Sequence, residues 1–71
     1  MTTVTVKVTV EDGVWTAECA ALGLVTESDT YEGLVSMAIE LAPEMAELNG
    51  VEFENLVLHF VHDCPVVHLA A

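Results

Sequence analysis

The sequence predicts a small α+β domain with the element order β-β-β-α-β, in which one amphipathic helix covers one face of a small antiparallel or mixed sheet. Changes of periodicity predict this order. Residues 3–10 alternate valine with polar residues, which is the two-residue period of a strand. From Thr30 the apolar residues recur every three or four positions, as on one face of a helix, and alternation returns after residue 55. We expect one domain, 1–71, with no separate DNA-binding domain.

Three strands are predicted before the helix. Residues 3–10 place four valines on one buried face, namely Val4, Val6, Val8 and Val10. The segment "EDG" at 11–13 supplies a turn in which Gly13 can take a positive φ, and "VWTAECA" then resumes with β-favouring residues, so the two segments predict an antiparallel hairpin. After Gly23, "LVTE" is long enough for a third, short strand.

The helix is predicted from Thr30 to "NG" at 49 and 50, a left-handed stop. Thr30 or Asp29 can cap it, and Asp29 with Glu32 has the spacing of a capping box. Pro43 predicts a kink, with two shorter helices as the alternative. The apolar stripe consists of Tyr31, Leu34, Val35, Ala38, Leu41, Ala42, Met45 and Leu48, and the opposite stripe of Glu32, Ser36, Glu40, Glu44 and Glu47.

The last predicted strand lies in "NLVLHFVHD" and has no polar face. Leu56, Leu58 and Phe60 lie on one side, whereas the other side carries Val57, His59 and Val61. This pattern predicts a strand covered on both sides. A single helix covers only one side, so we expect oligomerisation to cover Val57 and Val61. Pro65 predicts a break, beyond which "CPVVHLAA" could continue the strand.

Composition restricts the possible partners. Twelve acids against one base, Lys7, give a net charge of -11, which argues against direct binding to nucleic acid or to anionic membranes. A basic protein partner would suit this charge best, but an acidic surface that only keeps an apolar protein soluble is the favoured interpretation. Hydrophobic residues make up 54% of the chain, more than one small monomer should hide, so we expect a homo-oligomer or an obligate partner.

The same sequence predicts a cytoplasmic protein. No apolar run approaches the roughly 18 residues that span a bilayer, and the alternating N-terminus is unlike a signal peptide. In a reducing compartment Cys19 and Cys64 are expected to be free, buried thiols.

One cluster has the residue types of a metal site: His59, His62, Asp63, Cys64 and His68. His59 and His62 are an odd number of residues apart, so a regular strand points them to opposite faces. A break near Pro65 could bring His62, Cys64 and His68 together, but histidines on a sheet surface or at an interface are the favoured interpretation.

Catalytic patterns are weak. Glu27, Asp29 and Glu32 could be imagined as an acid–base pair, but helix capping already explains two of them. No base is placed beside Cys19, and no GxSxG, Walker or GxGxxG motif occurs. Trp15 and Tyr31 are expected to anchor the core or an interface. We predict no enzyme, no catalytic residue, no cofactor and no bound metal.

Three segments resemble the HicB-like family, most closely its short stand-alone members of unassigned function. They are "DGVWTAEC" at 12–19, "LGLVTESDT" at 22–30 and "LAPEMAELNG" at 41–50. The resemblance implies a β-β-β-α-β fold, a reduced ribonuclease H architecture without its catalytic carboxylates. The family has proline where this chain has Leu22, which predicts a looser turn.

HicB-like domains bind and mask HicA, a small basic RNA-cleaving toxin. The resemblance therefore implies an antitoxin-like, non-catalytic protein-binding module in a toxin–antitoxin system. We expect its basic partner to meet the acidic residues Glu40, Glu44 and Glu47 of the helix. The alternative is a self-assembling homo-oligomer without a toxin, and a third, weaker hypothesis is metal binding by the C-terminal histidines.

Overall fold

The computed structural model describes residues 1–63. Four strands form one mixed sheet in the order β3-β2-β1-β4, with β1 antiparallel to β2, β2 antiparallel to β3, and β1 parallel to β4. The predicted α+β fold and its β-β-β-α-β order are confirmed. The elements are β1 (Thr2–Glu11), β2 (Val14–Cys19), β3 (Leu24–Ser28), α1 (Tyr31–Leu48) and β4 (Leu56–His62).

The β1–β2 hairpin turns at Asp12 and Gly13. Both residues have positive φ, 51° and 77°, as in the type I′ turn, whose twist matches that of the flanking strands. Glu11 therefore pairs directly with Val14, and the predicted hairpin is confirmed.

The turn between β2 and β3 is tied to the end of the helix. The Nδ2 group of Asn49 donates to the carbonyl of Leu22 at 2.9 Å and to that of Met45 at 3.0 Å. Leu22 itself is fully buried, and Gly23 takes a φ of 68°. Leu22 thus anchors this turn in the core, contrary to the expectation of a looser one.

Helix α1 begins and ends at capped residues. Thr30, rather than Asp29, is the N-cap, and its hydroxyl accepts a hydrogen bond from the backbone N–H of Gly33 at 3.0 Å. The residue three positions after this cap is Gly33, so Asp29 and Glu32 do not form a capping box.

At the other end, Gly50 has a φ of 67° and donates to Glu47, while Val51 donates to Ala46 at 2.8 Å. This is the Schellman arrangement. Pro43 lies inside one continuous helix, so the two-helix alternative is wrong.

The core lies between α1 and the sheet. Along α1 the buried residues are spaced by four, and three of them are alanines, which let the helix backbone approach the sheet closely. Leu48, predicted to be buried, is 78% exposed because it lies two residues, about 200°, around the helix from buried Ala46. Val10 and Tyr31 are also partly exposed, at the end of β1 and the start of α1. The core residues are Val4, Val6, Val8, Ala17, Cys19, Leu22, Leu24, Leu34, Ala38, Ala42 and Ala46.

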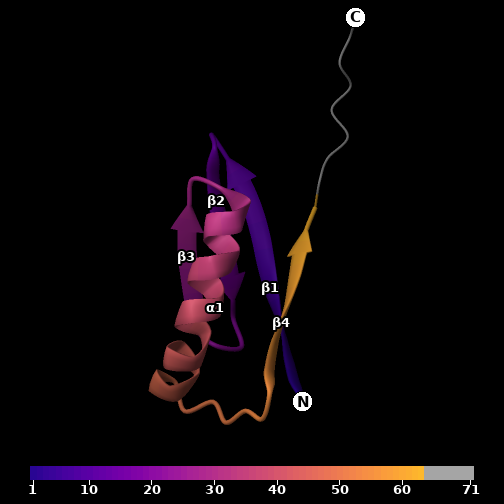
Figure 1. The fold of residues 1–71 in the computed structure, drawn as a ribbon, viewed down its shortest axis with the longest axis vertical. Helices are drawn as coiled ribbons and strands as arrows, with labels where there is room; N and C mark the ends of the chain where they lie inside the picture. The colour runs from indigo at the N-terminus through magenta and orange to yellow at the C-terminus, as the bar shows by residue number, and fades with distance from the viewer. Residues whose placement is uncertain (64–71) are drawn as a thin grey trace, which may run out of the picture.

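Helix α1 covers only part of the sheet. It packs mainly against β3 and β2, and Figure 1 shows β4 standing beyond β1 without a helix in front of it. Leu56, Leu58 and Phe60 are therefore only half-buried, and Val57 and Val61 on the opposite side are each 39% exposed. Within residues 1–63 of one copy, β4 is fully covered on neither side, because the single helix lies over the other edge of the sheet. Cover of Val57 and Val61 by oligomerisation stays a prediction.

The side of the sheet that faces away from α1 is called the open face here. It carries a polar row from β1, consisting of Thr3, Thr5, Lys7 and Thr9, beside Val57, His59 and Val61 of β4. Within residues 1–63, no helix is both long enough and apolar enough to cross a bilayer.

Candidate functional site: an apolar groove beside an edge strand

The predicted histidine cluster divides between two surfaces. His59 pairs with Thr5 and lies on the open face, whereas His62 pairs with Val8 and makes a T-shaped contact with Trp15, with ring centroids 5.1 Å apart. The odd spacing had predicted this separation. Residues 1–63 contain no group of three or more potential metal ligands, and Cys64 and His68 lie outside the described residues.

The carboxylates considered for acid–base chemistry are dispersed. Glu27 lies on the open face of β3 opposite Thr16, Asp29 precedes the helix, and Glu32 is in its first turn. All three are exposed. Cys19 is buried and free, as predicted, and faces the core. The described residues therefore do not gather these groups into one catalytic site.

An aromatic cluster closes one end of the helix-covered face. The Trp15 and Tyr31 rings are 5.4 Å apart, and the Tyr31 and Phe60 rings are 6.5 Å apart in a T-shaped contact. Together with His62, these rings join β2, the start of α1 and β4. Trp15 packs against the core, so the prediction that it is an anchor is confirmed, whereas Tyr31 is 39% exposed and contacts the core through its neighbouring rings.

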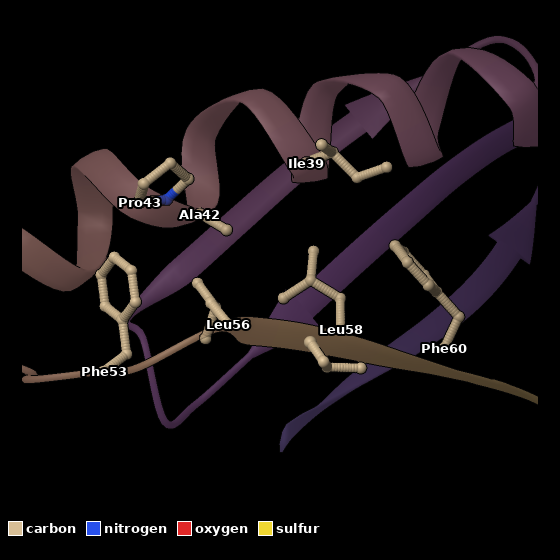
Figure 2. A pocket seen from close by; sticks show the side chains of 8 residues that line it. Ile39, Ala42, Pro43, Phe53, Leu56, Leu58 and Phe60 are labelled. Atoms are coloured by element: carbon tan, nitrogen blue, oxygen red, sulfur yellow. The ribbon is translucent and has the colours of Figure 1, made fainter. Parts of the chain in front are cut away.

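A groove of about 460 Å³ lies open between α1 and β4. It exists because α1 lies over β3 and β2, which leaves the inner face of β4 without a covering element. Figure 2 shows Leu56, Leu58 and Phe60 rising from β4 toward Ile39 and Pro43 on the helix. Its lining is apolar throughout and consists of Ile39, Ala42, Pro43, Phe53, Leu56, Val57, Leu58 and Phe60. We call this feature the α1–β4 groove.

Two lining residues expose much of their apolar surface. Ile39 is 58% exposed and Phe53 is 42% exposed. Pro43, which also lines the groove, has no N–H to donate to the carbonyl of Ile39 four residues earlier. These residues therefore offer a partner exposed apolar surface.

Carboxylates border one end of the α1–β4 groove. A neighbouring hollow shares Pro43 and Phe53 with the groove and is also lined by Glu44, Glu47 and Glu52. Glu40 is exposed on the same helix. The predicted partner-binding residues Glu40, Glu44 and Glu47 thus all lie on the exposed surface of α1, the last two beside the groove.

Sequence reasoning missed the groove itself. Ile39 was outside the predicted buried stripe, and Phe53 was in a connecting segment without an assigned role. Their apolar character was a usable signal, because a large apolar residue outside the buried stripe must be exposed or contact a partner.

Comparison with known proteins relates nearly the whole chain to others. A crystal structure of the hypothetical protein TTHA1013 from the extremely thermophilic bacterium Thermus thermophilus has 34% sequence identity and a TM-score of 0.82, covering 94% of this chain and 100% of that chain. A search of functionally curated proteins finds no match. Neither the family match nor the structural match carries a HicB description, so the HicB-like relationship stays a prediction. Residues 2–67 match the model of a domain of unknown function, DUF1902, and the chain belongs to this family.

Proposed function

We propose that this chain is a non-catalytic protein-binding module that docks a basic protein on the α1–β4 groove and its acidic border. The observation that carries the proposal is the combination of an open apolar groove with Glu44, Glu47 and Glu52 at one end. Apolar anchors supply most of the affinity at protein interfaces, and charges at the border speed association and select the partner.

The distribution of charge supports a basic partner. The only base of the chain, Lys7, lies on the open face, away from the groove, and the net charge is -11. Residues 1–63 also bury no charged or polar side chain, which supports a binding role over acid–base catalysis. The resemblance of residues 12–50 to HicB-like proteins favours one kind of partner, a small basic RNA-cleaving toxin that the module would mask.

Affinity capture from the native cell tests this function with four variants. Ile39→Gln removes apolar surface from the groove, and Met37→Gln makes the same type of change at a 41% exposed position of α1 that does not line it. Glu44→Lys combined with Glu47→Lys reverses the acidic border, and Glu27→Lys reverses a carboxylate on β3.

We expect the wild-type chain to recover a small basic protein whose retention falls as salt is raised. Ile39→Gln and the double lysine variant should lose it, whereas Met37→Gln and Glu27→Lys should keep it. An RNA-cleavage assay of the recovered protein, with and without the chain, then tests masking. Equal retention by all four variants, or recovery of no small basic protein, would refute the proposed function.

A further inference from the structure

We propose that a second copy of this chain pairs with the outer edge of β4, in antiparallel orientation, about a two-fold axis that passes through His59. The sheet would then run continuously across the two copies. This interface goes beyond the proposed function, because it uses the strand edge rather than the acidic border and forms without a basic partner.

The first observation is that β4 is an edge strand without the features that usually prevent edge-to-edge pairing. It is the last strand in the order β3-β2-β1-β4, and nothing within residues 1–63 pairs with its outer side. Edge strands are usually protected by shortness, by proline or by charged side chains. β4 has seven residues and contains no proline, lysine, arginine or acid, whereas the opposite edge, β3, has five residues and carries Glu27.

The second observation is the distribution of charge, which favours a second copy of this chain as the partner at this edge. Each copy carries a net charge of -11, so two copies can approach closely only where acidic side chains are absent. None of the twelve acids lies in Leu56–His62. A basic partner would be attracted to carboxylates and has no reason to prefer this edge, whereas a like-charged copy does.

The third observation is that β4 is complementary to itself. In an antiparallel pair, directly opposed residues lie on the same face of the sheet. A two-fold axis that relates two copies of one strand must therefore pass between the two copies of one residue. His59 is the middle residue of Leu56–His62 and is the residue at the axis in our proposal. Leu58 then lies opposite Phe60 of the second copy, on the side of the groove. Val57 lies opposite Val61 of the second copy on the open face, which covers two side chains that are each 39% exposed.

The second copy also completes the groove. The α1–β4 groove has a helix wall on one side only, and β4 forms its outer limit. Pairing β4 with β4 of the second copy joins the two grooves into one trough with a helix on each side. Ile39 and Pro43 of each copy would face each other across a floor of leucine and phenylalanine side chains.

The register also determines which side chains meet at the two-fold axis. At the axis the two copies of His59 lie directly opposite on the open face, with Thr5 beside each of them. The charged groups nearby on that face are Lys7 of β1 and Glu18 of β2, which oppose each other, and α1 lies on the other side of the sheet. The pairs at the axis therefore bring no two acidic side chains together, which suits two copies that each carry a net charge of -11.

Cysteine cross-linking tests the register, in a full-length chain with Cys19→Ala and Cys64→Ser. His59→Cys should form a disulfide-linked dimer, because opposed Cβ atoms in a strand pair are about 4.5–5.5 Å apart. Val57→Cys or Val61→Cys alone should not form a disulfide, because each cysteine lies four residues, about 14 Å, from the same cysteine of the second copy. A mixture of these two variants should cross-link, and Val25→Cys on β3 should not.

Analytical ultracentrifugation of the uncross-linked wild-type chain tests association. We expect twice the 7.6 kDa chain mass at micromolar concentrations. The double variant Val57→Glu with Val61→Glu places a glutamate opposite a glutamate at two positions of the strand pair and should weaken the dimer at least about tenfold. Val25→Glu, the same change at a 71% exposed position of the open face, should not.

A monomeric wild-type chain at about 100 μM would overturn the proposal, as would a failure of His59→Cys to cross-link faster than Val25→Cys. Circular dichroism identifies any variant that does not fold. In that case the cross-linking variants decide whether the proposed β4–β4 interface forms. These measurements use the purified chain alone, so they can contradict the dimer while the capture experiment supports the proposed function. The capture experiment can likewise fail while the dimer is found.

Discussion

Replacing Asn49 with alanine should lower the free energy of unfolding by about 2 kcal/mol. The side chain makes two hydrogen bonds, at 2.9 Å to the carbonyl of Leu22 and at 3.0 Å to that of Met45, each worth about 1 kcal/mol. For a domain of this size the loss corresponds to a fall in Tm of about 8–16 °C. Urea unfolding at one fixed protein concentration, followed by the fluorescence of half-buried Trp15, measures the change.

A double-mutant cycle with Gly23 makes this test specific. A Cβ atom at Gly23 would lie 2.8 Å from Nδ2 of Asn49, and the φ of 68° strains any other residue there. Gly23→Ala should therefore cost less in the Asn49→Ala background, because the contact is gone and only the backbone strain remains. If Asn49→Ala changes stability by less than about 0.5 kcal/mol, or if the two effects simply add, the helix end does not hold this turn.

Three further substitutions test the helix. Thr30→Ala removes the acceptor for the N–H of Gly33 and should cost about 1 kcal/mol in thermal or urea unfolding; an unchanged midpoint would contradict the cap. Pro43→Ala restores a donor for the carbonyl of Ile39 and should stabilise the chain by about 1–3 kcal/mol, so a loss of stability would show that the proline is needed for packing. Ala38→Leu forces a larger side chain into a fully buried position and should cost about 1–3 kcal/mol in urea unfolding, which a well-tolerated leucine would refute.

Local patterns were sufficient to predict the elements of the fold. Strict alternation marked β1, and the aspartate–glycine pair marked the turn that follows it. The helix was bounded by Thr30 and Gly50, which act through hydrogen bonds within a few residues. Such local signals predict the folded structure correctly because they depend on the neighbouring backbone rather than on distant contacts.

The candidate site could not be predicted in the same way. The groove exists because α1 lies over β3 and β2, and no local pattern specifies which strands a helix will cover. The predicted apolar stripe included Ala42 but not Ala46, which is fully buried, and two of its large residues, Leu41 and Met45, are only half-buried. Close approach of the helix backbone required small residues, and this requirement shows only after the sheet is in place.

The position of β4 also has a consequence for the order in which the chain opens. β1, β2, β3 and α1 contact their neighbours in sequence, but β4 is attached through its pairing with β1, where Leu56 meets Thr2. Its detachment would leave an antiparallel three-stranded sheet with the helix and most of the core intact. In the monomer, below the concentration at which two copies pair, backbone amides of Val57 to Val61 should therefore exchange with deuterated solvent sooner than those of β2. β4 would also be the last strand to dock during folding of the monomer.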